Sequence, residues 1–189
     1  MLVDTGVGPP GLWDGWQPER EGGLLPALCE RGVAPADVDV VLMTHDHVDH
    51  VGWNTDAAGE PVFLNARYLL DEAALARARS RPGTPHVRRC LLAIEDRLET
   101  FSGEAEIAPG VVTVPLPGHA EGHVGVRVGD GVLMVADAVP HPALLDHPEW
   151  QFLVELDPEQ ASATRYALVS GLKGERVVGS HFDQWRPVR

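Results

Sequence analysis

The stretch that decides the fold of this chain is Thr44-His45-Asp46-His47-Val48-Asp49-His50. It follows residues 38–43, a nearly unbroken apolar and β-branched run that predicts a buried strand. The polar residues therefore fall on a loop at the carboxyl end of that strand. Imidazole and carboxylate groups are good ligands for Zn²⁺ and similar cations. Four such donors in one loop exceed what one open catalytic zinc takes from a segment of this kind, which predicts two ions that share a site.

The same arrangement recurs at three later strand ends. Gly118-His119, Ala136-Asp137 and Ser180-His181 each follow a short apolar run. Ligands that are carried on loops at one edge of a rigid sheet can converge on a single site. We therefore group these residues with the donors of the first loop.

Composition limits the class of protein. The 189 residues are 44% hydrophobic and 23% charged, which is typical of a globular chain, and we expect one domain over residues 1–189. The net charge of −13 argues against a nucleic-acid or anionic-membrane partner. No apolar run approaches the roughly 20 residues that span a bilayer, and the N-terminus lacks the features of a signal peptide. Cys29 and Cys90 are isolated, so we expect reduced, buried thiols and a cytoplasmic location.

Hydrophobic periodicity predicts a mixed α/β domain with short elements. Helices are expected near residues 24–28 and over 71–79, 87–98 and 158–172, and the last begins at Asp157 as N-cap. Strands are expected at residues 2–3, 38–43, 61–70, 111–115, 124–128, 132–136 and 177–178. Gly129-Asp130-Gly131 indicates a hairpin between two of these strands.

The motif His45-x-His47-x-Asp49-His50, followed in order by His119, Asp137 and His181, resembles the metallo-β-lactamase superfamily. The resemblance extends from Asp4 to His181 and implies an αββα sandwich. Three further segments are similar to the branch of lactonase-like and organophosphate-hydrolase-like enzymes. They are His50-Val51-Gly52-Trp53-Asn54, Pro61-Val62-Phe63 and the segment from Pro117 to His123.

The resemblance implies two metal sites. The first would use His45, His47 and His119, and the second would use Asp49, His50 and His181. Asp137 and a hydroxide would bridge two Zn²⁺ ions, with Mn, Co or Fe as alternatives. Asp4 matches an aspartate that orders the ligand loops without binding metal, and His123 is expected to support the ligands in the same way.

The chemistry that follows is hydrolysis. Two cations make hydroxide available near neutral pH and polarise a carbonyl or phosphoryl oxygen. We expect a small ester substrate, most simply a lactone, with aryl-ester or phosphotriester cleavage as further activities. Asp49 and Asp137 are the expected catalytic carboxylates, and Asp49 is one candidate proton donor to the leaving alkoxide. The alternatives are a thioesterase similar to glyoxalase II and a truncated, non-catalytic metal-binding protein.

Substrate contacts are expected from aromatic residues and from one histidine. Trp53, three residues after His50, is the best candidate, and Phe63 and His141 are also expected near the site. Trp150 is a further member of this apolar wall, and Trp13 with Trp16 is a candidate lid.

Three features depart from the family pattern. The family has several strands before its first motif, whereas Asp4 lies near the start of this chain, so either the true start lies upstream or the leading strands are missing. Missing strands would expose a sheet edge, which would favour pairing with a second copy. Pro140 occupies the position where some lactonases have a tyrosine, which weakens the assignment as an acyl-homoserine lactonase. Ala136 stands where glycine is more common, a change that we expect to be tolerated.

Overall fold

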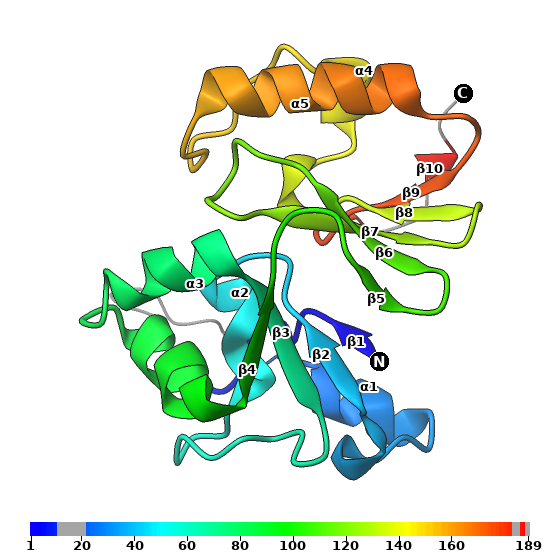
Figure 1. Cartoon of the computed structure of the whole chain (residues 1–189). Helices are drawn as coiled ribbons and strands as arrows, with labels where there is room; N and C mark the ends of the chain where they lie inside the picture. The colour runs from blue at the N-terminus through cyan, green and yellow to red at the C-terminus, as the bar shows by residue number, and fades with distance from the viewer. Residues whose placement is uncertain (11–21, 183–185, 188–189) are drawn as a thin grey trace. The chain divides into compact units, whose positions relative to one another are not determined.

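The computed structural model describes residues 1–10, 22–182 and 186–187, and its internal contacts divide the chain into two compact units, Met1–Phe101 and Ser102–Arg189. Each unit contains one β-sheet with its own helices, so the mixed α/β class predicted from the sequence is confirmed (Figure 1). The single domain over residues 1–189 stays a prediction. Trp13 and Trp16, the candidate lid, lie outside the described residues.

The first unit is built on a parallel four-stranded sheet in the order β1-β2-β3-β4. Its strands are β1 (Leu2–Val3), β2 (Val40–Leu42), β3 (Arg67–Asp71) and β4 (Leu98–Phe101). Its helices are α1 (Leu24–Glu30), α2 (Val48–Val51) and α3 (Glu72–Arg79), with 3₁₀ turns at Pro35–Asp37, Gly52–Asn54 and Leu92–Arg97 and a π-helical turn at Val87–Leu91.

The core of the first unit joins the sheet to α3. Tyr68 and Leu70 of β3 are fully buried and belong to one cluster with Ala74 and Ala78 of the helix. The helix begins where the side chain of Asp71 accepts a hydrogen bond from the backbone N–H of Ala73 at 2.9 Å. This packing gives β2 and the loop that follows it a rigid support.

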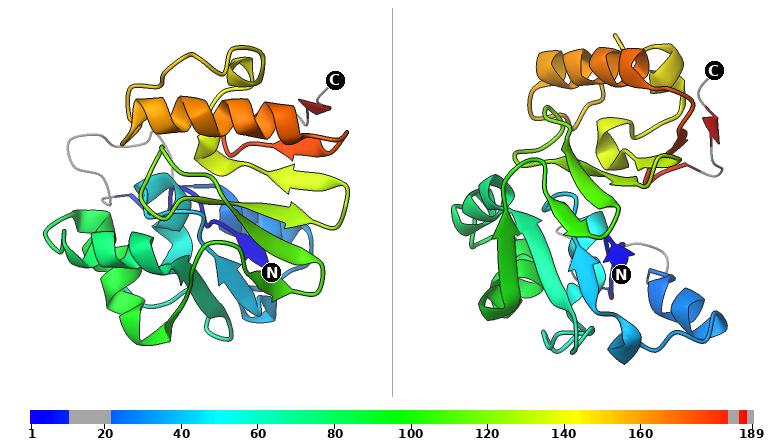
Figure 2. Two further views of the ribbon diagram at one scale, coloured as in Figure 1. Left: turned by 45° about the horizontal axis from the view of Figure 1, so that its top comes forward. Right: turned by 45° about the vertical axis from the view of Figure 1, so that its right-hand side comes forward.

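The second unit holds a six-stranded sheet in the order β10-β9-β8-β7-β6-β5, antiparallel except for the β8–β9 pair. Its strands are β5 (Glu106–Ala108), β6 (Val111–Pro115), β7 (Val124–Val128), β8 (Val132–Met134), β9 (Arg176–Val178) and β10 (Arg186–Pro187). A 3₁₀ turn (Ala136–Ala138), α4 (Ala143–Asp146) and α5 (Pro158–Gly171) complete it. Both views of Figure 2 show α5 running alongside this sheet, where Leu168 joins the core of Leu133 and Val177.

Several local predictions need correction. Residues 87–98 form two different turns and not one helix, because Ile94 has non-helical dihedral angles and β4 begins at Leu98. The helical spacing arises because Val87, Cys90 and Ile94 all face the core of the first unit. Within the predicted strand 61–70, only residues 67–70 pair in the sheet, as part of β3, and α2, α4, β4, β5 and β10 were not predicted.

The two cysteines differ in their surroundings. Cys29 is exposed, which corrects the prediction of a buried thiol there, and Cys90 is buried. Burial raises the pKa of the Cys90 thiol to about 11, so this thiol stays protonated at neutral pH. Among the helices of the described residues, none has the length and apolar character that crossing a bilayer requires.

Gly52 allows the N-terminal segment to touch the end of α2. Its N–H donates to the carbonyl of Gly6 at 2.8 Å. A Cβ at Gly52 would lie 2.2 Å from the carbonyl carbon of Val7 and 2.4 Å from the backbone nitrogen of Gly8. Because these are backbone atoms, a side chain at this position would separate the two segments.

We predict that Gly52→Ala lowers the free energy of unfolding by about 3 kcal/mol. Gly83→Ala is the matched control, because nothing lies within 4 Å of a Cβ at Gly83, and it should change the value by less than about 0.5 kcal/mol. Urea denaturation of both variants measures the difference. Equal stabilities would show that the close backbone contact does not exist in solution.

Candidate metal centre

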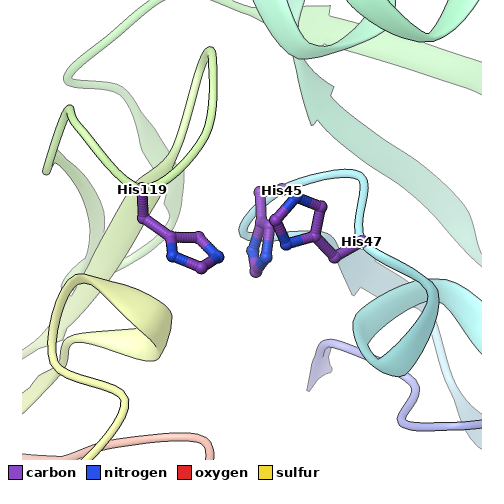
Figure 3. A group of neighbouring side chains, drawn as sticks. All are labelled: His45, His47 and His119. Carbon is purple, nitrogen blue, oxygen red and sulfur yellow. The ribbon is translucent and has the colours of Figure 1, made fainter. Parts of the chain in front are cut away.

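Three imidazole rings are packed together in the first unit. His45 and His47 lie on the loop after β2, and His50 lies in α2. The ring centroids of His45 and His47 are 4.5 Å apart, and those of His45 and His50 are 4.1 Å apart. His45 and His50 are buried, whereas Asp49 and His47 are partly exposed. Figure 3 draws the rings of His45 and His47 together with that of His119, which comes from the loop after β6.

The carboxylate of Asp4 holds this cluster from the end of β1. Its Oδ1 accepts the backbone N–H of Thr44 at 2.7 Å, and its Oδ2 lies 2.7 Å from Nδ1 of His50. Because β1 and β2 are parallel neighbours, the residues that follow them meet at the same sheet edge. With Nδ1 of His50 engaged by a carboxylate, Nε2 is the nitrogen that can bind a cation, which is the usual arrangement around metal-binding histidines.

Thr44 links Asp4 to His45 and orients the ring of that histidine. Its hydroxyl donates to Oδ2 of Asp4 at 2.9 Å and lies 3.0 Å from Nδ1 of His45. Because the hydroxyl proton is used on Asp4, the oxygen accepts the proton of His45 Nδ1. His45 therefore also presents Nε2 as its metal-binding atom. No role for Thr44 was predicted from the sequence, although this residue directly precedes the motif.

Thr5 and Asn54 secure the backbone of α2. The N–H of Thr5 donates to the carbonyl of His50 at 2.7 Å, and its hydroxyl donates to the side-chain oxygen of Asn54 at 3.0 Å. The amide of Asn54 donates in turn to the carbonyl of Cys90 at 3.1 Å. These buried polar contacts tie the helix that carries two predicted ligands to the N-terminal segment and to the turn at Val87–Leu91.

The second unit brings three further predicted ligands together. Asp137 lies in the 3₁₀ turn after β8 and is almost fully buried. Its Oδ2 is 3.6 Å from Nε2 of the buried His119 and 3.3 Å from Nε2 of the exposed His181. The N–H of Asp137 donates to Nε2 of His123 at 3.2 Å, so His123 supports the turn that carries the aspartate.

The start of α5 holds the loop of His119. Gly118 has φ +124°, and a Cβ there would lie 2.2 Å from the backbone nitrogen of Ala161. The carbonyl of Gly118 accepts the N–H of Asp157 at 2.8 Å, and the carbonyl of Pro117 accepts the hydroxyl of Thr164 at 2.6 Å. The loop therefore lies directly against the backbone of the helix, which requires glycine before the histidine.

The three residues predicted to contact the substrate are in contact with the protein itself. Trp53 is largely buried, and its indole N–H donates to the carbonyl of Gly22 at 3.0 Å. Phe63 is completely buried in the core of the first unit, so its ring has no exposed surface with which to contact a substrate. His141 is exposed, and its Nδ1 accepts the N–H of Ala143 at the start of α4.

The chemistry of the donors fits divalent metal ions. Each unit offers both imidazole nitrogens and carboxylate oxygens, which are ligands that zinc takes in catalytic sites. In the first unit, Asp4 and Thr44 orient two imidazoles, and in the second unit a buried carboxylate lies beside two more. Neither half requires a cysteine thiolate.

Comparison with known proteins supports the family resemblance found in the sequence. Residues 1–181 match the sequence profile of the metallo-beta-lactamase superfamily. The chain belongs to this superfamily. The match includes every predicted metal ligand and extends over nearly all of the chain, as the motif order indicated.

The relatives include lactonases. The N-acyl homoserine lactonase AiiA of Bacillus thuringiensis subsp. kurstaki is 29% identical over 157 residues, which cover 73% of this chain and 58% of that protein. Metallo-beta-lactamase domain-containing protein 1 of Xenopus laevis is 31% identical and matches 100% of this chain and 69% of its own length. The present chain thus spans 58% of the length of the curated lactonase.

Solved structures of this superfamily share the fold. The structure of AidC, a dizinc quorum-quenching lactonase in complex with the product N-hexanoyl-L-homoserine, has a TM-score of 0.83 at 24% identity. The similarity covers 98% of this chain and 74% of that chain. At this identity the comparison establishes the fold, and the two sheets predicted from the family resemblance are confirmed.

Ala136 adopts a left-handed backbone conformation, with φ +44°, directly before Asp137. An alanine in this region costs about 1 kcal/mol relative to glycine. We predict that Ala136→Gly raises the free energy of unfolding by about 1 kcal/mol. Ala138→Gly is the control, because Ala138 is buried in the same turn without a positive φ, and it should lower the value by about 1 kcal/mol. Urea denaturation measures the free energy of unfolding of both variants. If both variants were less stable than the unmodified protein, the backbone at Ala136 would not be strained.

Proposed function

We propose that this chain is a dinuclear metal-dependent hydrolase that cleaves a small ester, most simply a lactone. The observation that carries the proposal is the pair of pre-oriented donor groups. Asp4 and Thr44 present Nε2 of two histidines in the first unit, and the buried carboxylate of Asp137 lies beside His119 and His181 in the second. Donors that are oriented by fixed neighbours are typical of functional metal sites.

We assign the ligands to two groups. The first would contain His45, His47 and His119, and the second would contain Asp49, His50, Asp137 and His181. Zinc is the proposed metal, since AidC is a dizinc enzyme, and the same donors accept Mn, Co or Fe. When bound, the two ions supply hydroxide near neutral pH and polarise the carbonyl of the ester.

The remaining residues of the site position these donors. Asp4 is proposed to hold His50 directly and His45 through Thr44, and His123 to hold the backbone of Asp137. None of these three positioning groups needs to bind a metal ion itself. Trp53 and His141 stay predictions as substrate contacts, as does pairing with a second copy.

A lactone is favoured over the other candidates because several of the relatives are named lactonases. A thioesterase similar to glyoxalase II would need a cluster of arginines or lysines for the carboxylates of glutathione, and the sequence has no clear cluster of this kind near its C-terminus. The competing hypothesis is a protein that binds metal without catalysis, and measurements of hydrolytic activity distinguish it from an enzyme. Aryl esters and phosphotriesters are proposed as additional substrates of the same site.

An exposed apolar strip adjoins His119 in the second unit. We define it as residues 150–156, whose exposed apolar members are Trp150, Phe152, Leu153, Val154 and Leu156. The N–H of Leu156 donates to the carbonyl of His119 at 3.1 Å, so the strip is joined directly to a proposed ligand. We propose that it contacts the apolar part of the substrate.

A buried ion pair gives this strip a defined position. Arg165 of α5 is fully buried and binds the carboxylate of Glu155 and the carbonyl of Trp150. Its Nε also donates to the carbonyl of Pro148 at 3.2 Å. Because both ends of the strip are anchored, its apolar side chains stay exposed without collapsing onto the unit.

We predict that His47→Ala and Asp137→Ala each abolish lactone hydrolysis, because each removes a proposed ligand. Chelation of the metal should abolish the activity of the unmodified protein, and added Zn²⁺ should restore it. Asp96→Ala is the control, since Asp96 is exposed and outside the proposed ligand groups. Hydrolysis that persists in both ligand variants would refute the assignment.

We predict that Leu153→Ser lowers kcat/KM for a long-chain acyl lactone roughly tenfold and leaves a short-chain lactone nearly unchanged. Leu153 is 97% exposed, so the substitution removes apolar surface without opening a cavity. Leu64→Ser is the matched control, because Leu64 is also exposed but lies outside the strip. A chain-length profile that does not change would exclude the strip from substrate binding.

A further inference from the structure

Asp46 carries a buried carboxylate between two proposed metal ligands. It is completely buried, although it lies between His45 and His47 in the sequence. Nη1 of Arg77, in the last turn of α3, lies 3.3 Å from Oδ1 of Asp46, and Nη2 of Arg81 binds Oδ2. We call Asp46, Arg77 and Arg81 the acid–arginine cluster.

The backbone of Asp46 is held as well. Nε2 of His86 lies 3.1 Å from the carbonyl oxygen of Asp46, and because a carbonyl can only accept, Nε2 donates. Burial lowers the pKa of His86, so the ring is neutral at pH 7 and has one proton for this contact. Both the side chain and the carbonyl of Asp46 are therefore tied to the segment that begins with α3.

The energetic consequence is a stiff ligand loop. Burying a charged carboxylate away from water is strongly unfavourable in free energy unless the carboxylate is paired. Removing one partner of such a pair commonly lowers the free energy of unfolding by several kcal/mol. Any movement of the loop that separates Asp46 from both arginines would incur this cost. His45 and His47 share their backbone with Asp46, so the same constraint limits their movement.

We propose that the acid–arginine cluster is a positioning device that sets the metal affinity of His45 and His47. This inference rests on the proposed function, since it requires these histidines to bind metal. The cluster itself touches neither substrate nor metal. It acts by holding the two imidazoles in the binding geometry before the ion arrives, which reduces the ordering cost of binding.

The same helix offers a matched control. Arg77 and Arg79 are both in α3, but Arg79 pairs with Glu95 in an exposed contact of 2.7 Å, whereas the Arg77 partner is completely buried. Exposed pairs contribute little to stability. Arg77→Met therefore disturbs the cluster, and Arg79→Met removes the same chemical group from the same helix without touching it.

The test measures metal binding by purified full-length variants at a temperature at which circular dichroism shows each to be folded. The probe is Co²⁺ alone, followed by its visible absorption, with Zn²⁺ competition giving the affinity. We expect Arg77→Met to weaken binding tenfold or more and to alter the Co²⁺ spectrum. Arg79→Met should match the unmodified protein, and Arg77→Lys should restore part of the affinity.

The outcomes separate this inference from the proposed function. If the unmodified protein does not bind Co²⁺ or Zn²⁺, both proposals fail. If it binds them and Arg77→Met binds equally well with the same spectrum, the cluster serves only stability and the inference fails alone. Should Arg77→Met not fold, Arg81→Met provides the same test, because Arg81 is partly exposed and its removal opens less of the core.

Discussion

The histidine cluster of the first unit depends on one interaction, the hydrogen bonding of the Asp4 carboxylate. Its two oxygens contact three groups that belong to the loop after β2 and to α2. The residue has φ +58°, a conformation that few residues other than glycine adopt. Strain of this kind persists where the surroundings determine the conformation, and here the parallel pairing of β1 with β2 and the hydrogen bond from Thr5 to His50 determine it.

The second unit positions its predicted ligands by different contacts. His119 is held by direct contact between its loop and the first turn of α5, which Gly118 permits. Asp137 follows the strained Ala136 and is held by His123. In both units, therefore, a residue with a positive φ stands at or beside a carboxylate that contacts histidine, and buried hydrogen bonds keep it there.

Charge is distributed unevenly around these groups. The chain has a net charge of −13, yet two arginines, Arg77 in the last turn of α3 and Arg81 just after the helix, bind the buried carboxylate of Asp46. The buried carboxylate of Asp46 explains why these two arginines point into the first unit. Because Asp46 lies between two proposed ligands, the same ion pairs connect the stability of the unit with the geometry of those ligands.

Local sequence was sufficient to predict most strands from apolar runs and, from the spacing of His45, His47 and His50, the superfamily resemblance that implied the two sheets. It was insufficient for residues 87–98, where periodic burial looks the same in a helix and in two successive turns. Only the tertiary structure showed that Asp46 binds two arginines, that Thr44 connects Asp4 to His45, and that Phe63 is fully buried. These contacts join residues distant in the chain or depend on packing, so no local pattern of residues encodes them.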